Sequence, residues 1–431
     1  MAGAGSKLFT SGSVLTASDV NTYLMDQTIM KFTSTTTRDA AFGGAGEATL
    51  AEGMFAYTTD TNTLWLYDGS NWVNVLGSDI GTQALSNRNV IINGAMQVAQ
   101  RGTSTASITT ANYYTADRFG MDITSLGTWT QSVEADAPTG SGFRKSWKML
   151  CTTADASPAA SDYLLTSQKL EGQNVQQFLK GTSAAKSFAL SFWVKSNATG
   201  TYNVELLDND NTRVVTAAYT VDVSGTWEKK TIIFPADTTG AFDNDNANSL
   251  QLSWWLGAGT TFTSGTRDTL WGTVVNADRA VGQTNVAAAI NNYWQITGVQ
   301  LEAGSVATPF EFEDYGITLT KCQRYYNRTS GGYVGVGLAF STTGTSNYVK
   351  FPTTMRVAPS AVETTGTAAN YLQVLSNTGT QACNAVPTFV RAGTETAEVT
   401  STSASTGLTQ GHATFLLASS GSVYLGFSAE L

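Results

Sequence analysis

Reactive side chains are scarce in this 431-residue chain, which has one histidine and three cysteines. A histidine-dependent catalytic triad would have to use His412, and neither G-x-S-x-G nor H-E-x-x-H occurs. We expect His412 to lie at the surface or at a sheet edge. The cysteines Cys151, Cys322 and Cys383 are odd in number and far apart. They predict small buried side chains and neither a disulfide framework nor a zinc site.

Charge is also sparse, since Asp, Glu, Lys and Arg make up 13% of the residues and the net charge is -9. Nucleic-acid binding depends on clustered Lys and Arg, and no basic run occurs, so nucleic acid is excluded as a partner. No stretch approaches the roughly 18 apolar residues of a membrane span, which excludes membrane insertion. The first residues lack the apolar core of a signal peptide, and we expect synthesis in the cytoplasm without standard export.

What the chain does have is alternation of apolar and polar residues, with 42% hydrophobic residues overall. Long helices need charged pairs on their outer faces, which this composition cannot supply in number. Period-two runs separated by Gly-rich and Asx-rich loops predict a mainly β protein. We divide it into an N-terminal segment (1–80), a central antiparallel β-sandwich of the jelly-roll type (81–316) and a C-terminal β-sandwich domain (317–431).

The N-terminal segment predicts one amphipathic helix within residues 1–32 and a three-stranded meander at 53–76. Thr16 and Asp19 have the spacing of a capping box, and Val20, Tyr23, Leu24 and Met30 fall near one face. Neither the helix nor the meander buries enough surface alone, so the segment predicts a homotrimer. Residues 317–327 predict a short linking helix.

Two segments resemble known proteins. The N-terminal resemblance is carried by FTSGSVLTASDVNTYLMDQTIMKF and the meander GMFAYTTDTNTLWLYDGSNWV, and it is to tail and fibre proteins of tailed bacteriophages. The central one is carried by NRNVIINGAMQVAQRGTS with YTADRF, and by YWQITGVQLEAGSVATPFEFEDYG with CQRYY. That bracket resembles phage tail-fibre proteins whose central domain is like a carbohydrate-binding jelly roll. The resemblance implies a virion location, a trimer and host binding.

Aromatic side chains are the candidate binding residues. In the run Leu250 to Leu256 and in the strand around Phe192, Trp255 and Trp193 oppose the apolar face. Exposed rings stack on sugars, so both are candidates for a glycan platform; the alternatives are burial at a trimer interface or under a loop. In the C-terminal domain, the candidates Tyr333, Tyr348 and Tyr371 stand among small polar residues typical of binding loops, and the alternative is that they pack the sandwich.

Two further features have competing interpretations. Arg101, Asp117, Arg118 and Glu302 are ionic residues in a weakly charged chain, and we favour structural pairs over catalysis. The Asx-rich loops 208–211 and 243–246 predict tight turns; a structural Ca²⁺ is the alternative, and no other cofactor is expected.

The sequence therefore predicts a non-enzymatic tail-fibre or fibre-like virion protein that attaches to a host-surface glycan or envelope receptor by multivalent binding. Residues 1–80 would contact other virion proteins, and residues 317–431 would be the receptor-binding tip. One alternative is a purely structural collar, baseplate, head-fibre or decoration protein. The other is a capsule depolymerase with a carboxylate pair.

Overall fold

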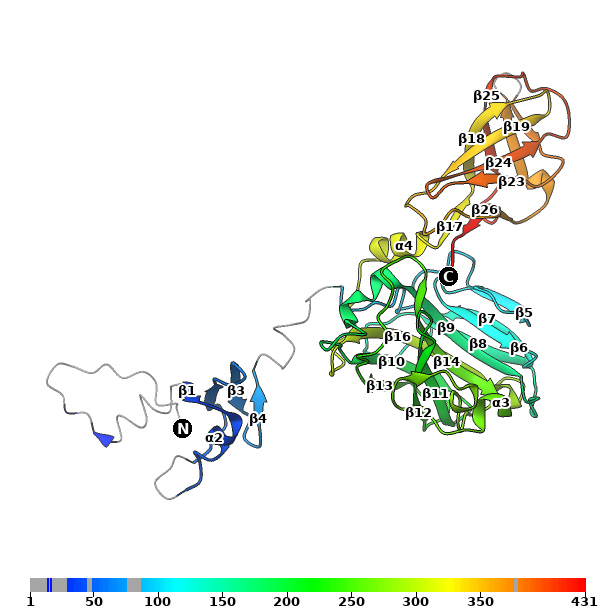
Figure 1. Ribbon diagram of the computed structural model, residues 1–431. Helices are drawn as coiled ribbons and strands as arrows, with labels where there is room; N and C mark the ends of the chain where they lie inside the picture. Colours follow the sequence, from blue (N-terminus) through cyan, green and yellow to red (C-terminus); the bar gives the residue numbers. More distant parts are fainter. Residues whose placement is uncertain (1–13, 15, 18–28, 45–48, 76–86, 376–378) are drawn as a thin grey trace. The chain divides into compact units, whose positions relative to one another are not determined.

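The computed structural model describes residues 14, 16–17, 29–44, 49–75, 87–375 and 379–431. The chain forms two compact units, residues 1–85 and 86–431 (Figure 1). The predicted mainly β class is confirmed, because strands make up most of the regular structure in both units. No helix in the described ranges has the length and apolar character needed to cross a membrane.

The first unit contains a four-stranded sheet with the order β1-β2-β3-β4. Its elements are β1 (Ile29–Phe32), α2 (Thr35–Asp39), β2 (Phe55–Thr58), β3 (Thr63–Tyr67) and β4 (Trp72–Asn74). The meander is confirmed, since β2, β3 and β4 are antiparallel neighbours. Asp68 forms the last turn by accepting the backbone N–H groups of Ser70 and Asn71 at 2.9 and 2.7 Å.

The predicted N-terminal helix lies mostly outside the described residues, including Asp19, Val20, Tyr23 and Leu24. At its end the prediction is wrong, because Met30 lies in β1, which pairs in parallel with β2. An edge strand was open for pairing there, and pairing satisfies backbone groups that a frayed helix end leaves unpaired.

Two antiparallel sheets of six strands each face one another in the central region (Figure 1). The first, called sheet A, has the order β13 (Glu228–Phe234), β10 (Phe188–Ser196), β16 (Tyr293–Ala303), β8 (Ser146–Thr153), β7 (Thr128–Glu134) and β5 (Ser104–Ile108). The second, called sheet B, has the order β15 (Gly272–Thr273), β12 (Arg213–Val221), β11 (Gly200–Asp208), β14 (Asn248–Ala258), β9 (Tyr163–Glu171) and β6 (Gly120–Thr124).

Period-two alternation positions the core between these sheets, as the sequence predicts. Phe188, Leu190 and Phe192 of β10 are fully buried, and Phe192 meets Trp254 of β14 edge to face at 5.7 Å between ring centroids. Residues one step along each strand point to the outer faces. After β14, the helix α3 (Thr260–Thr263) and the loop that follows it return across the outer face of sheet B, where they contact Trp255.

The C-terminal region begins with α4 (Tyr315–Gln323), the linking helix that the sequence predicts. Asp314 caps it, its side chain accepting from the Gly316 N–H at 2.8 Å. A three-stranded sheet has the order β17 (Tyr326–Ser330), β26 (Tyr424–Ser428) and β20 (Glu363–Thr364). A seven-stranded sheet, called sheet C, has the order β22 (Gly379–Ala382), β21 (Tyr371–Leu375), β25 (Ala413–Ala418), β18 (Gly332–Ala339), β19 (Gly344–Lys350), β24 (Thr396–Thr402) and β23 (Thr388–Ala392).

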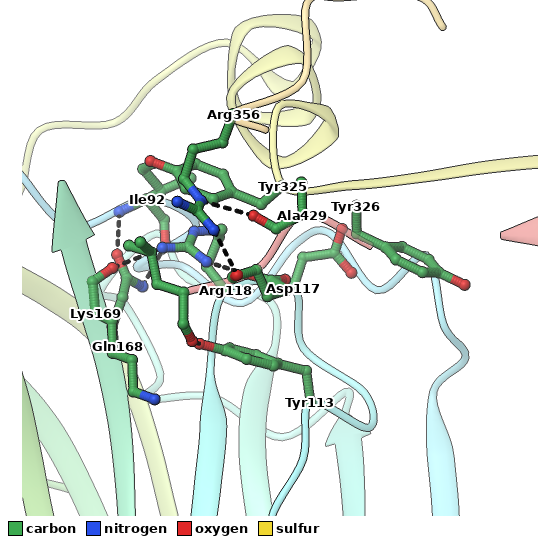
Figure 2. A network of polar contacts seen from close by, with 12 residues as sticks. Ile92, Tyr113, Asp117, Arg118, Gln168, Lys169, Tyr325, Tyr326, Arg356 and Ala429 are labelled. Carbon is green, nitrogen blue, oxygen red and sulfur yellow. Dashed lines mark hydrogen bonds and ion pairs between the residues drawn. The ribbon is translucent and has the colours of Figure 1, made fainter. Parts of the chain in front are cut away.

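A buried ionic cluster joins the end of the chain to the central sandwich (Figure 2). The Arg118 guanidinium donates to the Glu430 carboxylate and, at 2.6 Å, to the backbone oxygen of Lys169. It lies 3.4 Å from the ring centroid of Tyr325. Arg101 donates to the same carboxylate at 3.3 Å. The central and C-terminal β regions are thus linked by charges that only the folded chain brings together.

Candidate functional site

Trp255 is fully buried, which corrects its assignment to an exposed glycan platform. It does face away from the main core, as its alternation predicts, but the segment after β14 covers it. Arg279 lies 5.1 Å from its ring centroid, and the Phe262 ring is 5.3 Å away. Arg279 is fixed by Glu205, to which it donates at 2.6 Å. Of the alternatives weighed from the sequence, burial under a loop is the one observed.

Tyr371 is also buried, so it is removed from the binding candidates as well. Its hydroxyl donates to the backbone oxygen of Tyr424 at 2.6 Å and accepts from the Thr365 N–H at 3.2 Å. Burial raises the pKa of Tyr371. The side chain packs the C-terminal core, which is the alternative that the sequence left open.

Trp193 is partly exposed on the outer face of sheet A. Its cross-strand neighbours are Lys229 on β13 and Thr297 on β16. No other aromatic ring of the described residues stacks with it. A glycan platform on sheet A at Trp193 stays a prediction.

Tyr333 and Tyr348, by contrast, lie on one exposed face of sheet C. The register places Val336 directly opposite both Tyr348 and Phe415, so all three side chains share that face. Tyr333 stacks edge to face on Phe415 with ring centroids 5.2 Å apart. We call this surface the C-terminal apolar face, and its exposed fractions are 67% for Tyr333, 54% for Val336, 47% for Leu338, 47% for Tyr348 and 42% for Phe415.

Polar groups border the C-terminal apolar face on the side of β24. Glu398, opposite Tyr348, accepts from the Ser346 hydroxyl at 2.5 Å and from Arg391 at 2.7 Å. The hydrogen bond from Ser346, followed by that from Arg391, lowers the pKa of Glu398. Rings and aliphatic groups in the middle with a charged and hydroxyl-rich edge form a surface that suits a partner with both apolar and polar parts.

The sequence of sheet C explains why this face is apolar. β18 carries Val334 inward, where it is buried, and Val336 and Leu338 outward. β25 places Leu416 in the core and Phe415 outside. Strands with apolar residues on both faces are ordinarily covered on both sides. The sequence-based candidates included the two tyrosines but missed Val336, Leu338 and Phe415, and the signal that would have found them is this two-sided apolar pattern.

The first Asx-rich loop does not fit a calcium ion, because a lysine already fills the position. The buried ammonium of Lys180 contacts Asp208 Oδ2 at 2.6 Å and Asp237 Oδ2 at 3.0 Å. The backbone oxygens of Thr239 and Gly240 complete its surroundings at 3.0 and 2.7 Å. The second loop, 243–246, packs against the first, since the Asp243 N–H donates to Asp210 at 2.9 Å.

The ionic residues singled out from the sequence have structural partners. Arg118 pairs with Glu430, whereas Asp117 accepts from the backbone and side-chain amides of Gln100 at 2.8 and 2.5 Å. Burial raises the pKa of Asp117 to about 6. Glu302 is buried and accepts the Thr308 N–H at 2.7 Å. His412 is exposed beside β25, and the three cysteines are buried, as predicted.

Comparisons with known proteins give partial overlaps with solved structures. No family model matches the sequence, and no curated protein matches it. The enzymatically active domain of bacteriophage CBA120 tailspike protein 4 is 14% identical over 50% of this chain, with a TM-score of 0.28. The overlap spans 21% of that tailspike chain.

Carbohydrate-binding modules are the other structures of note. A family 11 module from Clostridium thermocellum, in complex with a β-1,3-1,4-mixed-linked tetrasaccharide, is 11% identical. The match covers 48% of this chain and 99% of the module, with a TM-score of 0.26. A xylan-binding domain of family 22 is 9% identical, covering 47% and 99% with a TM-score of 0.25.

Proposed function

We propose that this chain is a non-enzymatic adhesion protein of a tailed-phage virion, which attaches to the host surface through the C-terminal apolar face. The observation that carries the proposal is the group of rings and aliphatic side chains left exposed there, on Tyr333, Val336, Leu338, Tyr348 and Phe415. A contiguous exposed apolar surface marks an interaction site. The resemblance of the N-terminal and central segments to phage fibre proteins supplies the biological setting.

Host-surface glycans are the proposed receptor. The apolar face of a sugar ring packs on an aromatic ring, and Tyr333, Tyr348 and Phe415 present three such rings. The Glu398–Arg391 pair and Ser346 offer hydrogen-bonding groups at the border. Each such contact is weak alone, so attachment would depend on repetition of the face in a homotrimer and on several fibres.

Competition for adsorption tests the attachment. Purified full-length protein should block adsorption of the phage to its host cells, and the double substitution Tyr333→Ser with Tyr348→Ser should reduce the blocking at least tenfold. Val223→Ser is the matched control, since it removes a side chain that is 56% exposed in the central region. If the wild-type protein fails to block at saturation, host attachment is wrong and the chain is a structural component.

Light scattering on the same proteins separates attachment from self-association. We expect the wild type to be a trimer and the double variant to remain one. A variant that becomes monomeric would assign the C-terminal apolar face to contact between copies. Release of oligosaccharides from host polysaccharide by the wild type would contradict the non-enzymatic part of the proposal and favour a depolymerase.

Residues 1–80 are proposed to attach the chain to other virion proteins. The motive is their resemblance to the N-termini of phage tail proteins, together with their separation as a compact unit that ends at residue 85. Phage that encode the chain without residues 1–80 should assemble particles lacking the protein. Normal incorporation of the truncated chain, measured on purified particles, would move the attachment segment elsewhere.

A further inference from the structure

A polar pocket opens on the outer face of sheet B, away from the C-terminal apolar face. Its volume is about 170 Å³, and its lining includes Tyr113, Gly120, Asp122, Ser167 and Lys169. Pockets that enclose drug-sized molecules have roughly 300–1,000 Å³. The pocket on sheet B therefore suits a ligand of about one six-membered ring with its substituents.

Small residues form the floor of this pocket. The register of sheet B places Gly120 of β6 directly opposite Ser167 of β9, and both line the pocket. Because neither has a large side chain, the sheet is hollowed there. A Cβ atom at Gly120 would lie 3.1 Å from the Tyr113 ring, so the glycine lets that ring approach the sheet.

The aromatic wall is held in place from both ends. The Tyr113 hydroxyl donates to the backbone oxygen of Leu431 at 3.1 Å, and its N–H donates to Asn112 Oδ1 at 2.8 Å. Asn112 itself forms an isolated antiparallel bridge with Met121 of β6. Figure 2 shows Tyr113 beside the ionic cluster that fixes the end of the chain. A ring that is already immobilised loses little entropy when a ligand stacks on it.

Two opposite charges, on Asp122 and Lys169, flank the floor without a side-chain partner among the described residues of the two β regions. Within residues 87–375 and 379–431, the Asp122 carboxylate and the Lys169 ammonium form no ion pair and no side-chain hydrogen bond. Both are partly buried. Arg213, which is also partly buried on sheet B, is by contrast paired with Asp237. Partly buried polar groups without protein partners are available to a ligand.

The mixture of charges selects the class of ligand. An anionic group would meet Asp122, and a cationic group would meet Lys169, so neither kind of ion is favoured alone. An uncharged ring with several hydroxyl groups satisfies both, because a hydroxyl donates to a carboxylate and accepts from an ammonium. A pyranose also has an apolar face for the Tyr113 ring.

We propose that this pocket is a second sugar site, which binds one uncharged pyranose ring. This inference rests on the proposed function in one respect, because it assumes that the chain meets host glycans. Tyr113 supplies the stacking surface, Asp122 accepts from ring hydroxyls, and Lys169 donates to them. A trimer with one such site and one apolar face per chain would contact a glycan coat at two places in each copy, which increases avidity.

Saturation-transfer NMR on the full-length protein tests the pocket directly. The probes are methyl β-glucoside, methyl β-galactoside, methyl α-mannoside and the methyl glycoside of N-acetylglucosamine. We expect at least one to bind with a dissociation constant of about 1 mM, the affinity of a few weak contacts. Lys169→Met and Asp122→Asn should each weaken that binding about tenfold, and Lys186→Met, which removes an exposed lysine outside the pocket, should not change it.

Each outcome decides between the sites. Failure of all four glycosides to bind, or equal binding by wild type and the Lys169 and Asp122 variants, would overturn the pocket. In the adsorption competition, the pocket variants should still block, because the C-terminal apolar face carries attachment, but they should need a higher concentration than the wild type. Loss of sugar binding together with retained but weaker blocking supports two separate sites. If the wild type fails to block adsorption, the proposed function is rejected, but the sugar-binding measurement still tests the pocket independently.

Discussion

Sheet B and sheet C both carry aromatic side chains on their outer faces, but the rest of the chain covers Trp255 on sheet B and leaves the rings on sheet C exposed. On sheet B, Trp255 is fully buried beneath Arg279 and Phe262, which belong to the segment between β14 and β16. On sheet C, Tyr333 and Phe415 remain 67% and 42% exposed. The same residue class therefore serves stability in one region and is available for binding in the other.

The difference has an energetic meaning. Burying a large apolar side chain contributes about 1.5–3 kcal/mol relative to leaving it exposed. Sheet B gains this contribution within the chain, because a long connection crosses its outer face. Sheet C lacks this contribution to stability. A partner that covers Tyr333, Val336 and Phe415 would instead gain the same free energy on binding. Residues on sheet B should therefore be sensitive in stability measurements, whereas residues on the C-terminal apolar face should be sensitive in binding measurements.

The largest expected effect comes from carboxylates in the two environments. Glu430→Ala removes the buried partner of Arg118 and Arg101 and should lower the free energy of unfolding by about 3–5 kcal/mol, because it leaves buried charges uncompensated. Glu398→Ala removes the partner of Arg391, whose side chain is 74% exposed, and should cost about 0–1 kcal/mol. Urea unfolding of both variants measures the contrast, and equal losses would break it.

The Glu430 cluster also illustrates how far the sequence reaches. Arg118 and Asp117 stand out as ionic residues in a weakly charged chain, and a structural pair is the correct interpretation for Arg118. Its partner could not be identified, because Glu430 is 312 residues away and only the folded chain brings the two together. The pattern along a strand predicts which face of the sheet each side chain points to. The long-range partners of a side chain depend on how the sheets and loops assemble.

Besides long-range partners, the local sequence pattern does not predict whether another segment covers a side chain. Alternation correctly predicts that Trp255 faces away from the main core, yet its burial depends on a segment around Arg279 that shows no strand pattern. The exposure of Val336 and Phe415 was missed for the same reason, since local pattern does not show which face of sheet C another segment covers. The strands of the meander, the sandwich and the linking helix were predictable because local periodicity and turn residues determine them.

A pH series sharpens the comparison through carboxyl groups with opposite pKa shifts. Burial raises the pKa of Asp117 to about 6, so its contribution to stability is fully present below about pH 4 and is lost as the pH rises through 6. Asp117→Asn cannot ionise. The stability of the wild type relative to this variant should therefore fall by roughly 2–3 kcal/mol between pH 4 and pH 7.

Glu398, at the border of the C-terminal apolar face, has a pKa shift of the opposite sign. Its pKa is lowered, so its contribution is present above the unfolded pKa and is lost as the pH falls through the folded value. In acid both carboxyls are protonated, so the wild type should approach each variant in stability. Towards neutral pH the wild type should become more stable relative to Glu398→Gln and less stable relative to Asp117→Asn. Parallel unfolding curves for wild type and Asp117→Asn across the whole range would show that Asp117 is not held in an ion-excluding site.

The smallest expected effect comes from removing the hydroxyl of a tyrosine, which is buried on Tyr371 and exposed on Tyr333. Tyr371→Phe removes the donor to the Tyr424 backbone oxygen and the acceptor of the Thr365 N–H, which should cost about 1–2 kcal/mol because two partly buried backbone groups lose a partner. Tyr333→Phe, on the open face, should change stability by less than about 0.5 kcal/mol. Thermal unfolding of both measures this difference. If Tyr333→Phe proves as destabilising as Tyr371→Phe, another copy of the chain must already cover Tyr333, and the C-terminal apolar face would then be a contact between copies.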